Sequence, residues 1–128
     1  MSIKKEYEAI AEVIDTYLKG MRTGSEGYWR TAFYPDCLVI AANDENPVSS
    51  ITPIMDYAKF IADQHNAGIK CEEFPLGSEI RFIGNIGSVR LDWKFVLGEQ
   101  ILYGTTFFNL LKRNGTWKFS QKIYYVTH

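Results

Sequence analysis

Residues 110–119 read LLKRNGTWKF, and this stretch decides how the C-terminal half folds. Asn114 and Gly115 both tolerate positive φ, so an Asn-Gly pair between two strand-like segments is a strong signal of a two-residue hairpin turn. The segments on either side, Ile101 to Leu111 and Thr116 to Val126, are rich in β-branched and aromatic residues. We therefore expect a long antiparallel hairpin here.

Working upstream, two further strands are predicted over Ser78 to Ile83 and Ser88 to Leu97, separated by a Gly84 to Gly87 turn. A second turn over Gly98 to Gln100 leads to the final hairpin. Strict alternation of apolar and polar residues is typical of a half-buried strand. In two strands this pattern places the following residues on one face: Val89, Leu91, Trp93 and Phe95, and then Trp117, Phe119, Gln121, Ile123 and Tyr125.

The stretch from Lys70 to Gly77 contains Pro75, and it is either an edge strand or an approach loop. In the N-terminal half, apolar residues recur every three or four positions from Ile3 to Met21, which predicts an amphipathic helix. Ser2 is placed to cap its start and Gly24 to end it.

A short second helix is predicted from about Ser25 to the residues before Pro35. Strands follow over Cys37 to Ala42 and around Val48 to Ile51. Thr52 as cap and Pro53 at the first helical position then predict a third helix, which Gly68 closes. The expected order is α-α-β-β-α-β-β-β-β, an α+β fold in one domain over residues 1–128.

Composition sets the class of protein. The chain has 128 residues, 15% of them aromatic, and a net charge of −1. A basic face for nucleic acid is not expected, nor is a membrane span or a secretory signal, so the predicted location is the cytoplasm. Cys37 and Cys71 are expected as buried free thiols, with a disulfide as the alternative. No metal-ligand spacing and no dinucleotide or phosphate loop stands out, so neither a metal nor another cofactor is expected.

Three landmarks resemble the nuclear-transport-factor-2-like (NTF2-like) superfamily, and within it the putative lumazine-binding and SnoaL-like branches. They are Tyr17 to Met21 late in the first helix, Phe33 to Asp36 before the first strand, and the 110–119 stretch. The resemblance implies a cone in which three helices pack on a strongly curved, mainly antiparallel sheet around an apolar cavity. It also implies a homodimer, often paired through the outer sheet face. The fold hosts both enzymes and binding proteins, so it does not decide function.

The resemblance also offers a test for ketosteroid-isomerase chemistry, which needs a carboxylate base and buried proton donors. The donor on the first helix matches Tyr17. The position of the base falls at about Ala41, and that of the second donor falls near Gly104. The isomerase set is therefore mostly absent.

The remaining catalytic candidates are few. Asp92, beside Trp93, is a candidate carboxylate, although Arg90 and Lys94 on the same face favour a solvated charge ladder. Tyr17 is a second candidate, with a core or pocket-wall role as the alternative. The histidines His65 and His128 are expected to lie at a helix end and at the chain end, outside any catalytic pair.

A binding cavity is the leading hypothesis. Helix stripes and strand parity are expected to bring eight side chains to one interior as ligand-binding residues: Tyr17, Trp29, Phe33, Trp93, Tyr103, Asn109, Gln121 and Tyr125. Aromatic rings with a few amides and hydroxyls suit a planar heterocyclic or aromatic ligand. The alternatives are a completely filled core, a SnoaL-like isomerase, dehydratase or cyclase using Asp92 or Tyr17 with help from Asn109, or a protein-interaction module.

Overall fold

The structure is a computed structural model, and it describes residues 2–127. These residues form three helices and six strands in the predicted order. The helices are α1 (Ile3–Thr23), α2 (Glu26–Ala32) and α3 (Ile54–Asn66). The strands are β1 (Leu38–Asn43), β2 (Ser50–Pro53), β3 (Cys71–Ile83), β4 (Ile86–Leu97), β5 (Gln100–Arg113) and β6 (Thr116–Val126).

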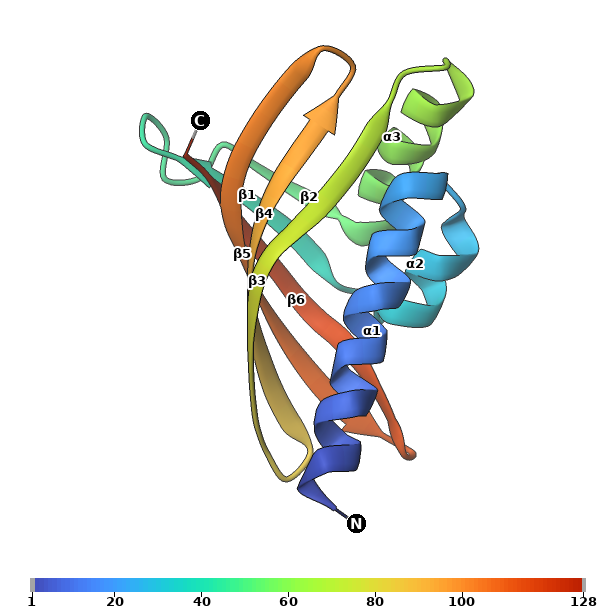
Figure 1. Ribbon diagram of the computed structural model, residues 1–128, viewed down its shortest axis with the longest axis vertical. Helices are drawn as coiled ribbons and strands as arrows, with labels where there is room; N and C mark the ends of the chain where they lie inside the picture. The colour runs from blue at the N-terminus through green and yellow to red at the C-terminus, as the bar shows by residue number, and fades with distance from the viewer. Residues whose placement is uncertain (1, 128) are drawn as a thin grey trace.

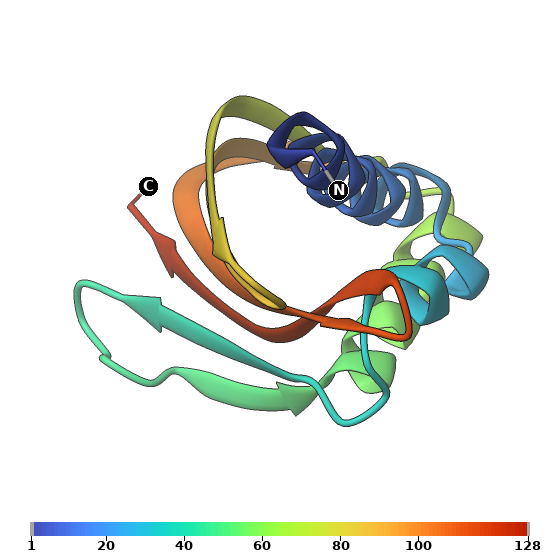
Figure 2. The ribbon, with the colours of Figure 1, turned by 90° about the horizontal axis from the view of Figure 1, so that it is seen from below.

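All six strands belong to one sheet with the order β2-β1-β6-β5-β4-β3. β1 pairs with β6 in parallel, and every other neighbouring pair is antiparallel. The sheet curls strongly around one side of the molecule, and the three helices lie along its open side (Figures 1 and 2). This arrangement confirms the expected cone of helices on a curved, mainly antiparallel sheet.

The predicted ends of α1 are confirmed. The Ser2 side chain accepts a hydrogen bond from the Lys5 backbone N–H, and Gly24 closes the helix at φ +73°. The start of α3 differs from the prediction. Thr52 and Pro53 end β2, and the helix begins at Ile54 without a side-chain cap, because β2 remains paired with β1 up to Pro53.

The stretch that sequence left open, Lys70 to Gly77, is mostly strand. β3 begins at Cys71 and forms one edge of the sheet, so Pro75 occupies an edge strand, where a missing N–H is tolerated. The pairing of β3 with β4 shifts register between Pro75 and Gly77. At the start of β3, Cys71 and Glu73 are both buried, and Glu73 contacts Tyr17 in the C-terminal half of α1.

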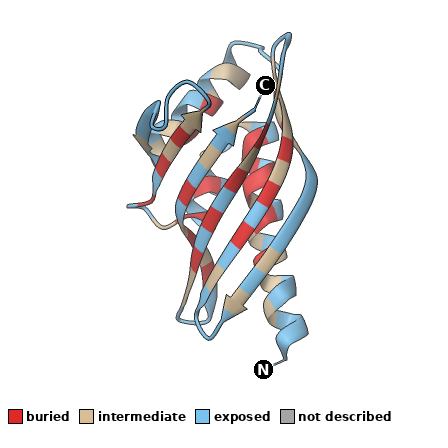
Figure 3. Ribbon diagram, turned by 90° about the vertical axis from the view of Figure 1, so that its left-hand side faces the viewer, coloured by how far each residue is buried: buried red, intermediate tan, exposed pale blue. Residues whose placement is uncertain are grey.

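The core lies between the concave face of the sheet and the helices, and buried and exposed residues alternate along the strands (Figure 3). Phe108 of β5 stacks on Phe119 of β6, with ring centroids 4.0 Å apart. Tyr17 meets both Trp29 and Phe33 edge-on at 5.2 and 5.8 Å. Such ring pairs contribute about 0.5–1.5 kcal/mol each beyond burial.

A β-bulge in β6 changes which residues face the core. Asn109 pairs with Gln121, but Leu110 pairs with Phe119, so Ser120 is an extra residue on β6. Before the bulge Trp117 and Phe119 point inward, and beyond it Lys122 does. An added residue moves every following side chain to the opposite face, because strand side chains alternate with a period of two.

Candidate functional site

Three polar side chains from separate elements meet inside the cone. The Tyr17 hydroxyl on α1 donates a hydrogen bond to Oε1 of Glu73 on β3 at 2.6 Å. Nζ of Lys122 on β6 donates to the same hydroxyl at 2.8 Å. The three residues are 0%, 7% and 2% exposed, respectively. Buried Glu and Lys are rare unless they are paired, so this cluster is the most unusual chemical feature of the interior.

Aromatic rings surround the Lys122 nitrogen. It lies 4.7, 4.4 and 5.3 Å from the ring centres of Tyr17, Tyr57 and Tyr124. The negative π-faces of aromatic rings attract a cation, and this attraction amounts to about 2 kcal/mol when the pair is desolvated. The rings therefore offset part of the cost of removing the lysine from water.

A cavity of about 100 Å³ lies against this cluster. It is bounded by residues of α3, β3, β4, β5 and β6, namely Tyr57, Glu73, Trp93, Phe95, Leu102, Thr106, Lys122, Tyr124 and Val126. The indole N–H of Trp93 donates to the Thr106 hydroxyl at 2.8 Å, which fixes the ring as one wall. Phe95, Leu102 and Val126 are partly exposed, so the cavity reaches solvent near the β4–β5 hairpin.

The hydrogen bonding of the cluster is incomplete. Oε2 of Glu73 is buried and has no hydrogen-bond partner. Lys122 has three donor hydrogens, and its hydrogen bond to Tyr17 uses one of them. Buried polar atoms are nearly always satisfied, so the second carboxylate oxygen and the remaining ammonium hydrogens have unused hydrogen-bonding capacity for a water or a ligand.

Burial shifts the acid–base properties of the cluster in opposing directions. Desolvation lowers the pKa of Lys122 to about 8, although the charge of Glu73 opposes this. Desolvation also raises the pKa of Glu73, against the effects of Lys122 and of the Tyr17 hydrogen bond. Both shifts favour the neutral forms, because a low-dielectric interior disfavours the charged ones. The pKa values of Tyr17 and Tyr57 rise well above 10, mainly because both are buried.

A glycine makes room for the Trp93 ring that lines the cavity. Gly104 on β5 pairs with Trp93 on β4, and a Cβ at Gly104 would lie 2.5 Å from Cζ2 of the indole ring and would clash with the Tyr125 carbonyl oxygen. The missing side chain lets the indole lie flat across β5. The position that the isomerase comparison assigns to a second proton donor is therefore the space that the Trp93 ring occupies.

The structure brings four of the eight predicted binding residues into the interior. Trp93 lines the cavity itself, and Tyr17 reaches it through Glu73 and Lys122. Trp29 and Phe33 are buried behind Tyr17, where they stack on each other with ring centroids 5.7 Å apart. These two residues fill the core and do not line the cavity.

The expectation that the other four face the interior is wrong. Tyr103, Asn109, Gln121 and Tyr125 all lie on the outer face, and the Asn109 amide donates to the Gln121 side chain at 2.8 Å. On β6 the bulge at Ser120 reverses the alternation. On β5, apolar residues stand at both odd and even positions, as Phe107 and Phe108 do. The alternation of apolar and polar residues therefore does not decide which face of β5 is inward.

The other titratable candidates lie outside the cluster. Asp92 is on the outer face, where it accepts hydrogen bonds from Thr105 and Arg90, and these lower its pKa. The Arg90–Asp92 pair is one half of the predicted charge ladder, whereas Lys94 lies over the Phe74 ring. His65 ends α3, where its Nε2 lies 2.8 Å from the Met21 carbonyl oxygen, and His128 is outside the described residues. Cys37 and Cys71 are free and buried.

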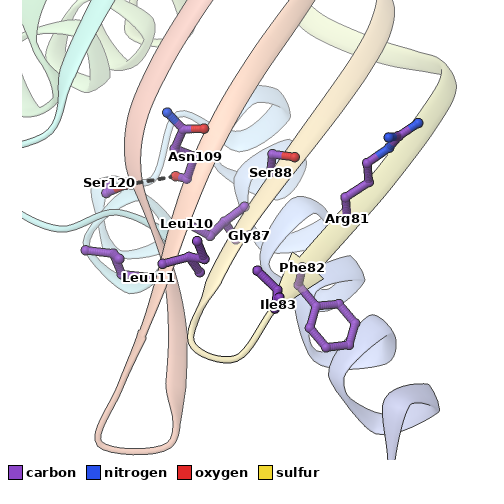
Figure 4. A pocket seen from close by; sticks show the side chains of 10 residues that line it. Arg81, Phe82, Ile83, Gly87, Ser88, Asn109, Leu110, Leu111 and Ser120 are labelled. Carbon is purple, nitrogen blue, oxygen red and sulfur yellow. Dashed lines mark hydrogen bonds between the residues drawn. The ribbon is translucent and has the colours of Figure 1, made fainter.

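A larger hollow, of about 490 Å³, lies on the outer side of the sheet over β3, β4 and β5 (Figure 4). In this view α1 is behind the strands, and Ser88 and Asn109 project toward the viewer. Leu110, Leu111, Ile83 and Ile86 make the hollow mainly apolar. Its charged member, Arg81, already pairs with Glu79 at 2.7 Å. The outer hollow is thus mainly apolar, whereas the inner cavity contains the ionisable side chains of Glu73 and Lys122.

Sequence reasoning missed both ionisable members of the cluster. Lys122 alternates with aromatic residues and was assigned to solvent because the bulge was not recognised. Glu73 lies in the stretch left open as strand or loop, so its side chain was not assigned to a face. The sequence did contain one indication. Cys71, Glu73 and Pro75 are two residues apart, so in a strand the Glu73 carboxylate lies on the same face as the Cys71 thiol, which was expected to be buried.

Two general features complete the description. No helix within residues 2–127 is long and apolar enough to cross a membrane. Across the same residues, no group of three His, Cys, Asp or Glu side chains is arranged to hold a metal ion.

Residues 5–125 match the sequence family described as putative lumazine-binding, and this match spans nearly the whole chain. The chain belongs to the putative lumazine-binding family. No protein of curated function matches the sequence significantly.

Solved structures place this member of the putative lumazine-binding family in the NTF2-like superfamily. An NTF2-like protein of unknown function from Shewanella baltica is 25% identical, with a TM-score of 0.80 over 100% of this chain and 98% of that one. An NTF2-like superfamily protein from Salmonella enterica is 18% identical, with a TM-score of 0.79 over 99% and 94%. A putative scytalone dehydratase from Novosphingobium aromaticivorans is 21% identical, with a TM-score of 0.74 over 96% and 85%. The last two show the shared fold.

Proposed function

We propose that this protein binds a small, uncharged, planar heterocycle in the cavity beside Glu73 and Lys122. The observation that carries the proposal is Glu73, which lines the cavity and whose buried Oε2 has no hydrogen-bond partner. A ligand N–H group directed at this oxygen would satisfy it. A ligand carbonyl could accept from Lys122, which has donors to spare.

Charge and shape narrow the ligand class. Glu73 and Lys122 together carry no net charge in either protonation state, which favours a neutral ligand. Trp93, Tyr57 and Tyr124 supply flat aromatic surfaces, which suit a planar ring. A cyclic amide carries an N–H donor and a carbonyl acceptor side by side on one ring edge. Lumazine, the compound in the family description, is a fused two-ring member of this class.

The size of the cavity limits how much of a ligand it can enclose. At about 100 Å³ it is well below the roughly 300–1,000 Å³ typical of drug-sized sites. One ring fits inside the cavity and a second fused ring would extend toward its rim, so a small heterocycle is favoured over a larger cofactor. The partly exposed rim formed by Phe95, Leu102 and Val126 is where ring substituents would leave the cavity.

A thermal-shift screen followed by calorimetric titration tests this function. Lumazine and 1,3-dimethyllumazine form a matched pair, because methylation removes the N–H donors but keeps the ring. At 100 times its dissociation constant a ligand adds about 2.7 kcal/mol of stability, an easily measured shift. We expect lumazine or a smaller cyclic amide to stabilise the protein and the dimethyl compound not to do so.

Glu73→Gln tests the residue, with Asp92→Asn on the outer face as the matched carboxylate-to-amide control. We expect Glu73→Gln to weaken binding at least tenfold, since one charge-assisted hydrogen bond contributes about 1.5–3 kcal/mol. The control should bind as the unmodified protein does. Equal affinity of the Glu73 variant, or no stabilisation by any small cyclic amide, would contradict the proposal.

A second copy of this chain is the proposed partner of the outer sheet face. Phe107 and Ile123 lie opposite each other on β5 and β6 and are 55% and 39% exposed. The apolar hollow beside Ile83 and Ile86 extends this surface. Exposed apolar patches of this kind commonly mark interfaces. Light scattering should report a dimer, and Phe107→Lys should give a monomer; a monomer at all concentrations without the substitution would exclude this partner.

A further inference from the structure

We propose that Lys122 forms a reversible imine with small aldehydes or ketones in the inner cavity, with Tyr17 and Glu73 moving the protons. This inference rests on the ligand cavity of the proposed function and adds a covalent reaction to it. It assigns Lys122 as a nucleophile, Tyr17 as a proton conduit and Glu73 as the acid.

The hydrogen-bond chain provides the route for the first proton. Lys122 donates to the Tyr17 oxygen at 2.8 Å, and Tyr17 donates to Glu73 at 2.6 Å. If each proton moves one step along this chain, the ammonium becomes a neutral amine and the carboxylate becomes a carboxylic acid. Tyr17 ends as it began, with one proton. The opposing pKa shifts of Lys122 and Glu73 favour this neutral pair.

The cavity brings the reacting groups together without bulk water. Lys122 and Glu73 both line the cavity and both are at least nine-tenths buried. A desolvated lysine beside acid–base groups is the usual arrangement of an amine that attacks carbonyl carbon. The one hydrogen bond that Lys122 makes leaves its nitrogen free to turn toward a bound carbonyl, and the surrounding tyrosine rings stabilise the cation that results.

The atoms balance over two steps. The amine lone pair attacks the carbonyl carbon, and a proton transfers from nitrogen to the former carbonyl oxygen, which gives a neutral carbinolamine. The Glu73 acid then protonates the hydroxyl group, which leaves as water. The products are a protonated imine on Lys122 and a Glu73 carboxylate, so the cavity returns to one positive and one negative charge. No oxidant or reductant is needed.

Reductive trapping provides the test. The protein is incubated at pH 7 with acetaldehyde, which is small enough for the cavity, in the presence of sodium cyanoborohydride, and the modified lysines are located by peptide mass spectrometry. With a pKa of about 8, roughly one Lys122 in ten is neutral at pH 7, against about one in 2,500 for an ordinary lysine. We expect Lys122 to be modified at least tenfold faster than the exposed Lys59.

Variants separate the reaction from folding effects. Lys122→Arg keeps the charge but provides no comparable nucleophile, and it should lose the fast modification while its thermal unfolding stays cooperative. Tyr17→Phe breaks the proton chain. It should slow modification of Lys122 at pH 7 by tenfold or more and much less at pH 9.5, where the amine is already neutral. A purely structural role of Tyr17 would give the same slowing at both pH values.

Two results would overturn the inference. One is modification of Lys122 no faster than that of Lys59. The other is that the Lys122→Arg variant is modified as fast as the unmodified protein, which would mean that the fast-reacting amine is a different one. If lumazine binds but acetaldehyde does not trap Lys122, the imine inference fails and the proposed function stands. If acetaldehyde traps Lys122 but no heterocycle binds, the imine inference stands and the proposed heterocycle binding fails. Protection of Lys122 from trapping by saturating lumazine would support both.

Discussion

The side-chain nitrogen of Lys122 lies 4.4 Å from the centre of the Tyr57 ring, so α3 places an aromatic face against the charge that β6 carries into the core. The lysine is nevertheless buried, and its pKa of about 8 lies below the ordinary 10.5. Stability should therefore depend on pH in a window set by this one side chain.

We expect the stability of the protein, relative to Lys122→Met, to rise with pH between about 8 and 10.5. In this window the unfolded chain keeps the lysine proton and the folded chain has released it, so raising the pH favours folding. The full effect of a shift of this size is about 3 kcal/mol. Urea unfolding of both proteins at pH 7 and pH 10 measures it.

The other groups facing Lys122 do not titrate in the lower part of this window. Burial raises the pKa of Cys37 to about 11 and that of Tyr57 well above 10. Lys122 lowers the pKa of Glu73, so this pKa is higher in Lys122→Met than in the unmodified protein. A stability difference between the two proteins that stays constant from pH 7 to pH 10 would mean that Lys122 has an ordinary pKa.

Tyr17→Phe is expected to destabilise the protein by about 2–4 kcal/mol. The substitution removes one hydroxyl but leaves two buried groups, Glu73 and Lys122, without their shared partner. Urea unfolding at pH 7 measures the loss. Tyr125→Phe is the matched control, because it removes a hydroxyl whose partner, Asp44, is on the exposed surface. The control should change stability by less than about 0.5 kcal/mol.

Glu73→Gln is expected to lower the pKa of Lys122 further. The negative charge of Glu73 favours the ammonium form, so its removal leaves desolvation less opposed. Titration of the Lys122 side-chain carbon signals by NMR measures the change, and Asp92→Asn should leave the signals unaltered. A raised Lys122 pKa in the Glu73 variant would contradict the assignment of Glu73 as its charge partner.

Gly104→Ala is expected to cost about 1–3 kcal/mol and to disturb the cavity wall. An added methyl group would overlap the Trp93 indole and the Tyr125 carbonyl oxygen, which forces the sheet or the ring to move. Differential scanning calorimetry gives the stability change, and Trp fluorescence reports the ring. Gly77→Ala, where an added Cβ meets no atom within 4 Å, is the control and should be nearly silent.

The fold was largely predictable because its signals are local. Asn114 and Gly115 set the final hairpin, and Ser2 and Gly24 set the ends of α1, each through the conformation of a few neighbouring residues. The start of α3 was misplaced because Thr52 and Pro53 carry a helix-start signal that β1–β2 pairing overrides.

The site was less predictable because it depends on register over long distances. Tyr17 and Trp93 were identified from their positions on a helix stripe and an alternating strand. Glu73 and Lys122 were not, since which face each occupies depends on strand pairing and on one extra residue at Ser120. Alternation in sequence assumes an unbroken strand, so a bulge that leaves no glycine or proline signal reverses the assignment beyond it.

The bulge at Ser120 also gives this fold a way to change its chemistry without changing side chains. Beyond it, Lys122, Tyr124 and Val126 face inward, while Gln121, Ile123 and Tyr125 face outward. Deleting one codon at this position would exchange the two sets and present an amide and a phenol to the cavity instead of an amine. An insertion or deletion at a single strand position can thus change the residues that face the cavity and those on the outer face at the same time. Point substitutions would need many steps to produce the same exchange.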